Sequence, residues 1–205
     1  MVRRQSSGSR DLPVLSVASQ TAWETWLAEH HTTSLGVWLQ VVKKASAKNG
    51  ASYAEALDVA LCFGWIDGQK DRLDDDYWLQ RFTPRTARSK WSKINREKAT
   101  KLVAQGKMRS AGRAHVEQAK ADGRWDAAYE SQSVAVVPDD FRAAPEKNSK
   151  ARAFFSTLDG RNRYAILYRI QDAKKPETRA RRIEKYVAML GEEQTIHPGA
   201  ETRFL

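Results

Sequence analysis

Every strand-like segment of this 205-residue chain lies within its first 85 residues. Residues 37–42 (VWLQVV) form a run of β-branched and aromatic residues, which is typical of a strand. Two further short runs, 65–67 and 77–82, flank the polar segment 69–76, which indicates an antiparallel pair beside the first strand. Beyond residue 89 the apolar residues recur with helical spacing. The sequence therefore predicts an α+β fold: a small antiparallel sheet of about three strands packed with helices, followed by an α-helical C-terminal half.

Capping residues mark where the helices begin. Thr21–Glu24 and Ser52–Glu55 each place a hydroxyl three residues before a glutamate, which is the pattern of a capping box. Gly64 follows the second of these helices in the position where glycine commonly ends a helix. A basic helix is predicted to begin at Ser89 or Ser92, and the residues leave both starts open.

The pattern of helices, prolines and polar residues divides the chain into segments. The region with few periodic apolar residues and two prolines, Pro138 and Pro145, is typical of a linker. We predict a disordered basic arm, an α+β core domain with the basic helices, a linker, a helical C-terminal subdomain and a tail, at residues 1–18, 19–130, 131–148, 149–198 and 199–205.

Positive charge is concentrated in one part of the chain. The whole sequence has 35 Lys and Arg against 25 Asp and Glu, a formal net charge of +10. Residues 79–125 alone hold 13 basic and 3 acidic side chains, so this stretch carries a net charge equal to that of the entire chain. Because evenly spread charge would serve only solubility, this concentration predicts a positive surface for an anionic partner.

Several classes of protein are excluded by what the sequence lacks. A single cysteine, Cys62, excludes a disulfide framework and a cysteine-based zinc site, and its apolar neighbours predict a buried, inert thiol. No apolar run approaches the roughly 18 residues of a transmembrane helix. No apolar segment follows the basic N-terminal residues, so we expect no secretory leader and a cytoplasmic location. Metal-ligand spacings and phosphate-binding glycine motifs are missing, so we predict no metal and no cofactor.

The first candidate site is a possible ligand pocket formed by Trp65, Asp67 and Gln69. In one interpretation Asp67 stands at the end of a strand beside an aromatic ring and contacts a ligand or acts as a general base. In the other, Trp65 fills the core and Asp67 begins a turn completed by Gly68. The residues leave both interpretations open, and no catalytic residue is assigned beyond Asp67 as a candidate.

The second candidate site is the basic stretch itself. Arginine matches oxyanion geometry with two parallel N–H donors, and a helix N-terminus adds backbone donors. An aromatic ring among cations offers a surface on which a nucleobase could stack. The alternative is a basic surface kept for solubility. The predicted anion-binding or nucleic-acid-binding residues are Arg81, Arg85, Arg88, Lys90, Trp91, Lys93, Arg96, Lys101, Lys107, Arg109 and Arg113.

Several motifs resemble those of a known family. Residues 60–69 (ALCFGWIDGQ), 81–85 (RFTPR) and 89–95 (SKWSKIN) are similar to motifs of the YdeI/OmpD-associated family, also called bacteriocin-protection proteins. Gly123–Trp125 and Glu177–Lys185 resemble later motifs of the same family, so the similarity extends over roughly residues 20–198. The resemblance implies a bacterial accessory protein linked to envelope stress and to resistance against bacteriocins or cationic antimicrobial peptides. It implies no particular reaction.

Three functions follow as hypotheses. The first is a non-catalytic stress-protection protein that binds nucleic acid or another polyanion through its basic face. The second is an envelope-stress module that binds a protein partner. The third is an enzyme or sensor for a small anionic, phosphorylated ligand held between Asp67 and Arg85. Because like charges repel, direct capture of cationic peptides by a protein of net charge +10 is unfavourable. The sequence does not determine the oligomeric state.

Overall fold

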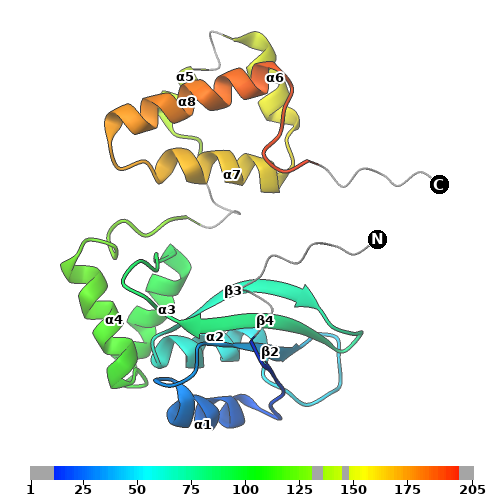
Figure 1. The fold of residues 1–205 in the computed structure, drawn as a ribbon, viewed down its shortest axis with the longest axis vertical. Helices are drawn as coiled ribbons and strands as arrows, with labels where there is room; N and C mark the ends of the chain where they lie inside the picture. Colours follow the sequence, from blue (N-terminus) through cyan, green and yellow to red (C-terminus); the bar gives the residue numbers. More distant parts are fainter. Residues whose placement is uncertain (1–11, 131–135, 145–147, 199–205) are drawn as a thin grey trace. The chain divides into compact units, whose positions relative to one another are not determined.

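The chain divides into two compact units. The computed structural model describes residues 12–130, 136–144 and 148–198. The N-terminal unit comprises Met1–Ala128 and the C-terminal unit Tyr129–Leu205 (Figure 1). Most of the predicted arm, the predicted tail and parts of the predicted linker lie outside the described residues.

A four-stranded sheet organises the N-terminal unit. Its strands are β1 (Val14–Leu15), β2 (Val37–Val42), β3 (Trp65–Arg72) and β4 (Tyr77–Pro84), in the order β1-β2-β4-β3. β2 and β3 both pair antiparallel with β4, whereas β1 runs parallel to β2. The predicted α+β class is therefore confirmed, with four strands instead of three. The additional strand lies in the predicted arm, where two residues are too few to produce a recognisable alternation.

β3 is longer than its sequence indicates. The polar segment predicted as a connecting loop continues the strand to Arg72, and a bulge interrupts the register between Asp67 and Lys70. The buried Gln80 side-chain amide donates to the carbonyl oxygens of Gly68 at 3.0 Å and Gln69 at 3.1 Å. These bonds bring a side-chain donor to carbonyl groups at the irregular part of the ladder. A strand exposed to water needs no apolar pattern, so hydrophobic periodicity does not reveal it.

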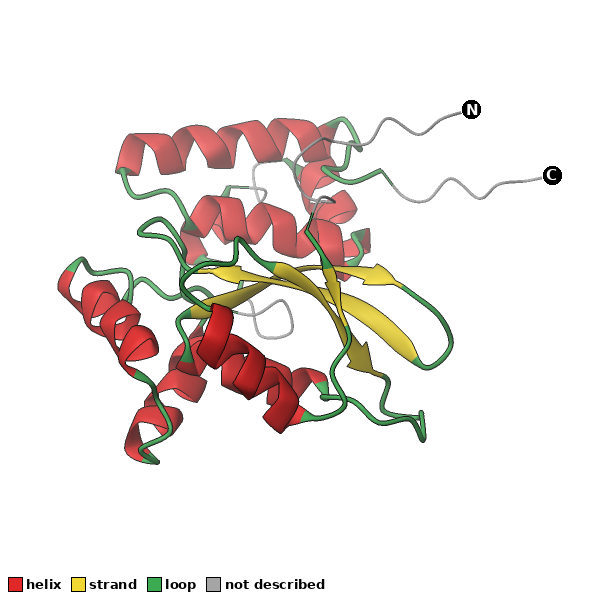
Figure 2. Cartoon of the chain, turned by 60° about the horizontal axis from the view of Figure 1, so that its bottom comes forward, coloured by secondary structure: helices red, strands yellow, loops and turns green. Residues whose placement is uncertain are grey.

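Helices α1 (Gln20–His30) and α2 (Tyr53–Cys62) contribute to the core on one face of this sheet (Figure 2). Trp23 and Leu27 of α1 belong to the same buried cluster as Leu39 and Phe82 of the sheet. The capping box of α2 is confirmed, because the Ser52 hydroxyl and the Glu55 carboxylate each accept a backbone hydrogen bond. The predicted cap of α1 is wrong: Ser19 caps this helix by accepting from the Ala22 amide.

A helical hairpin completes the N-terminal unit. Its helices are α3 (Lys93–Ala104) and α4 (Ser110–Ala121). Ser92 caps α3 by accepting from the Asn95 amide, which decides between the two predicted starts. α4 crosses the end of α2 so closely that Gly112 lies against backbone carbonyls there. Cys62 is buried at this crossing, and desolvation raises the pKa of its thiol to about 11.

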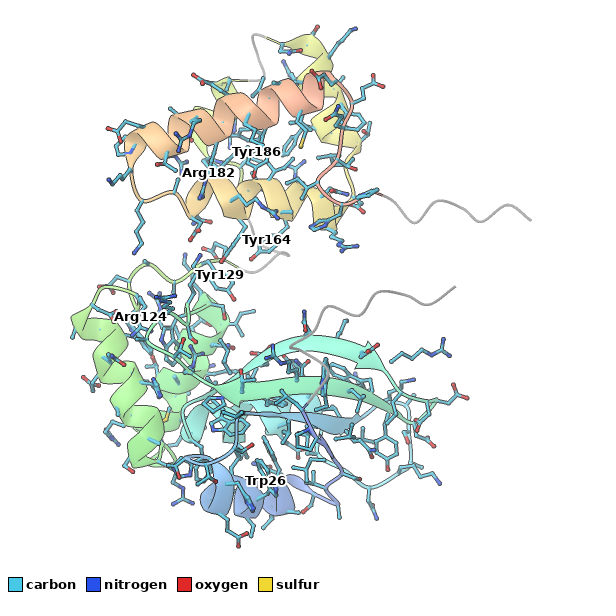
Figure 3. All side chains as sticks on the ribbon, in the orientation of Figure 1. Trp26, Arg124, Tyr129, Tyr164, Arg182 and Tyr186 are labelled. Atoms are coloured by element: carbon cyan, nitrogen blue, oxygen red, sulfur yellow. The ribbon has the colours of Figure 1, made fainter. Side chains whose placement is uncertain are left out.

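The C-terminal unit is helical, as predicted. It contains α5 (Asp139–Ala143), α6 (Ser149–Thr157), α7 (Gly160–Gln171) and α8 (Pro176–Gly191), which share a second core. Tyr186 belongs to this core and lies between α8 and α7 (Figure 3). Tyr164 lies on the other side of α7, where its hydroxyl donates to the Glu130 carbonyl and burial raises its pKa to about 12.

The predicted linker contains folded structure. α5 lies within it, and Phe141 has 0 % of its surface exposed in the core of the C-terminal unit. A single buried aromatic residue in a five-residue helix is too short a signal for a periodicity argument. Among the described residues, no helix is long and apolar enough to cross a membrane.

Candidate polyanion-binding surface

Two of the residues predicted to contact a ligand instead form the core of the basic region. Trp91 is only 2 % exposed, and its ring meets Trp125 edge-on with 4.9 Å between centroids. Arg85 is 5 % exposed; its Cζ lies 3.7 Å from the Trp91 ring centroid, and its Nη1 donates to the Lys90 carbonyl at 3.2 Å. The prediction that Trp91 stacks on a nucleobase is therefore wrong, because the ring is already covered by protein.

This stack ties three segments together. Arg96 of α3 donates to the Trp125 carbonyl at 3.1 Å. Arg124, just after α4 (Figure 3), donates to the Ser89 carbonyl at 2.9 Å and forms an ion pair with Asp122 at 2.7 Å. Residues 85–125, here called the basic hairpin, therefore form one substructure made of a loop, α3, α4 and the turn that follows. The buried cation and the two indole rings hold the loop against the helices.

Three further cations of the basic hairpin form ion pairs. Lys98 pairs with Asp58 at 2.6 Å, and Lys120 pairs with Glu117 at 2.9 Å. Arg109, one of the predicted ligand contacts, forms a 2.7 Å ion pair with Glu24 of α1, and this hydrogen bond raises the pKa of Arg109. Arg109 thus helps to join α4 to α1.

The cations that remain lie at the surface. Within the described parts of the chain, the charged groups of Arg88, Lys101, Lys107 and Arg113 form no ion pair and no hydrogen bond. Lys90 is exposed next to them in sequence, and Lys93 is half-buried. These side chains extend over the loop before α3, the end of α3, the connection to α4 and α4 itself. They form a positive surface at both ends of the helical hairpin.

Arg81 does not belong to this surface. It lies on β4 opposite Trp38 of β2, and it is half-buried in the sheet. Its neighbours on the strand, Gln80 and Phe82, are buried and point to the face that carries α1 and α2, so Arg81 points to the other face. Arg81 is close to the basic stretch in sequence, but its side chain is half-buried on the sheet.

The three residues of the predicted ligand pocket do not meet. Trp65 is buried in the core, and its indole nitrogen donates to the His31 carbonyl at 3.2 Å. Gln69 is exposed at the strand bulge. Asp67 is half-buried and accepts hydrogen bonds from the Tyr53 hydroxyl at 2.8 Å and the Asn95 amide at 3.4 Å. Asp67 thus braces β3 against the first turns of α2 and α3.

The partners of Asp67 were not predicted, although their positions carry a signal. Tyr53 is the first residue after the Ser52 cap, and Asn95 lies three residues after the Ser92 cap. First-turn side chains surround a helix N-terminus, where a carboxylate is electrostatically favoured. Arg85 is buried against Trp91, and Asp67 is held by Tyr53 and Asn95. The arrangement therefore gives no support to the small-ligand enzyme or sensor.

A hollow of about 600 Å³ lies between α1 and the start of α4. Its lining includes Glu24, Glu29, His31 and Arg109, so both signs of charge are present. The Glu24–Arg109 ion pair lies in this lining. Such a mixed surface does not select an anion, and the hollow adds nothing to the positive surface of the basic hairpin.

Two family models match the chain. Residues 15–115 match a domain of unknown function (DUF8412). Residues 134–193 match the family described as "Bacteriocin-protection, YdeI or OmpD-Associated". Over this segment the chain is similar to YdeI/OmpD-associated proteins. No curated protein and no solved structure matches the chain.

The YdeI/OmpD-associated match covers α5 to α8 and includes the predicted family motif at Glu177–Lys185. It confirms the resemblance in this part of the chain. The motifs at residues 60–69, 81–85 and 89–95 fall instead within the other match. Most of the basic hairpin therefore lies in the segment that matches the domain of unknown function, whereas the match to the named family lies in the C-terminal unit.

Proposed function

We propose that this protein is non-catalytic and binds a polyanion, nucleic acid above all, through the basic hairpin. The observation that supports the proposal is the composition of residues 79–125, with 13 basic and 3 acidic side chains, of which Arg88, Lys101, Lys107 and Arg113 are exposed without described ion pairs. A nucleic-acid ligand would place this action in the cytoplasm.

The spacing of the exposed cations favours a polymer over a small ion. Arg88 precedes α3, whereas Lys101 and Lys107 lie at its far end. A helix of 12 residues is about 18 Å long, so one phosphate cannot reach both ends. A chain of phosphates can contact them together, and release of its counterions then contributes to binding.

The test replaces the four exposed cations by glutamine, as Arg88→Gln, Lys101→Gln, Lys107→Gln and Arg113→Gln together. We expect affinity for labelled single-stranded DNA, duplex DNA and RNA of about 20 nucleotides to fall at least about tenfold at low salt. Fluorescence anisotropy measures the affinities. All four residues are exposed, so circular dichroism should show an unchanged fold.

A matched control removes the same charge elsewhere in the N-terminal unit. Lys44, Lys48, Lys70 and Arg72 are exposed and lie outside the basic hairpin. Their combined replacement by glutamine lowers the net charge equally and should leave most of the affinity. Equal losses in both variants would show that total charge, and not the basic hairpin, determines binding. Failure of the wild type to bind any of the three probes would refute the proposal.

The family match favours a second function, protection against bacteriocins. With a net charge of +10, this protein would repel cationic peptides, so protection would act through a nucleic acid or a protein partner in the stress response. We expect cells that lose this protein to become more sensitive to a bacteriocin. The wild-type protein should restore survival, whereas the variant with four replaced cations should not. Full rescue by that variant would show that protection does not depend on polyanion binding by the basic hairpin.

A further inference from the structure

The C-terminal unit contains a hollow whose lining is both cationic and aromatic. It has a volume of about 460 Å³, within the range of small-molecule sites. Its lining comes from α5, α6 and α7 and from the residues before α5. The side chains that matter are Val137, Phe141, Arg142, Arg152, Phe155 and Arg163.

Two of the three arginines keep their hydrogen-bond donors available. Arg152 is exposed, and within the described residues its side chain has no hydrogen bond or ion pair. Arg163 places its Cζ 4.6 Å from the Phe155 ring centroid, and no described residue accepts a hydrogen bond from its guanidinium. Each guanidinium has five N–H donors in a planar fork, which suits an oxyanion.

The third arginine is partly engaged. Arg142 donates to the Val137 carbonyl at 3.3 Å and lies 3.7 Å from the Asp139 carboxylate. The Asp139 side chain is 97 % exposed, so water screens this ion pair and its energy is small. Asp139 is not part of the lining, and the described lining contains no carboxylate.

The apolar part of the hollow has a defined shape. Phe141 is fully buried, and Phe155 meets it edge-on with 5.3 Å between ring centroids. On α6, Phe155 follows Arg152 by three residues, which places both on one face of the helix. The Phe155 ring therefore lies beside two guanidinium groups for which the described residues provide no hydrogen-bond acceptor.

We propose that this hollow binds a small organic anion that joins a phosphate or carboxylate to an aromatic or bulky apolar group. The oxyanion would bridge Arg152 and Arg163, and the apolar group would pack on Phe155, which the buried Phe141 supports. An oxyanion alone would leave the aromatic surface in water, and a neutral apolar molecule would leave the arginines without a partner. The site belongs to the C-terminal unit and is independent of the basic hairpin.

Calorimetric titration of the full chain tests the site with 1-naphthyl phosphate and 1-naphthoate as probes. We expect saturable binding of at least one probe with one site per chain, and the tighter probe identifies the preferred oxyanion. Inorganic phosphate and neutral 1-naphthol should each bind at least about tenfold more weakly, because each offers half of the contacts. Arg152→Gln and Arg163→Gln should each weaken the preferred probe at least about tenfold.

Arg161→Gln is the matched control, because Arg161 is exposed on α7 and does not line the hollow. It should leave the probe affinity unchanged, as should the variant with four cations removed from the basic hairpin. If the variant with four hairpin cations removed no longer bound the probe, the probe would bind at the basic hairpin, and the proposal would be overturned. Equally tight binding of 1-naphthol, no binding of either probe, or full affinity in Arg152→Gln would also overturn it. Arg152 is exposed, so its variant remains informative if Arg163→Gln unfolds.

Discussion

Replacing Trp91 by alanine should lower the free energy of unfolding of the N-terminal unit by about 3–5 kcal/mol, the range typical of buried tryptophan and phenylalanine. The indole ring is 2 % exposed and contacts both Arg85 and Trp125. Its loss would leave a cavity, and the buried guanidinium of Arg85 would lose its contact with the ring. The loop that carries Arg88 and Lys90 would no longer be held against the helices by the buried Trp91 ring.

Tryptophan fluorescence can follow this transition selectively. All seven tryptophans of the chain lie between residues 23 and 125, within the N-terminal unit. A urea titration read by tryptophan emission therefore reports on this unit, and Trp91→Phe serves as the conservative control that keeps an aromatic platform. We expect Trp91→Phe to destabilise much less than Trp91→Ala. A loss below about 1 kcal/mol for Trp91→Ala would contradict the role of the stack.

Gly112→Ala should destabilise the same unit by about 2 kcal/mol or more, although alanine is normally the better helix residue by about 1 kcal/mol. A Cβ atom at this position would lie 2.4 Å from the Cys62 carbonyl oxygen and 2.5 Å from that of Leu61. Both atoms belong to the backbone at the end of α2, so neither can move without shifting one helix away from the other. The close crossing of α4 and α2 requires glycine here.

The control for Gly112→Ala lies two residues further along α4. Ala114 is exposed, so Ala114→Gly should follow helix propensity and lower stability by about 1 kcal/mol. The two substitutions are the reverse of each other, yet both should destabilise. The same fluorescence-monitored urea titration measures both. Stabilisation by Gly112→Ala would show that the helices do not cross as closely as described.

Local signals predicted much of the fold because they act over a few residues. The β-branched run at residues 37–42 forms β2, the Ser52–Glu55 capping box begins α2, and Pro176 begins α8. The predicted cap of α1 is wrong because two hydroxyl residues, Ser19 and Thr21, lie within three positions, and either side chain could cap a helix. Only the backbone shows which hydroxyl accepts from the first turn.

The candidate sites depended on contacts between distant residues, and these were harder to predict. Charge counting located the basic hairpin correctly as a region of positive charge, but it could not tell that Arg85 would be buried against Trp91. The partner that completes this stack, Trp125, lies 34 residues further along the chain. The arginines of the C-terminal hollow come from three helices, so no short motif contains them. A stretch of sequence shows charge, whereas a structure shows which charges face solvent.

The salt dependence of nucleic-acid affinity tests the central claim most directly. Each phosphate contacted on single-stranded DNA contributes about −0.7 to the slope of log affinity against log salt concentration. With four exposed cations in contact, the wild type should show a slope near −3 between about 50 and 200 mM salt. Removing Arg88, Lys101, Lys107 and Arg113 should bring the slope close to zero, whereas removing the four matched cations outside the basic hairpin should leave it near −3. A wild-type slope near zero, or the same slope in both variants, would contradict polyanion binding by the basic hairpin.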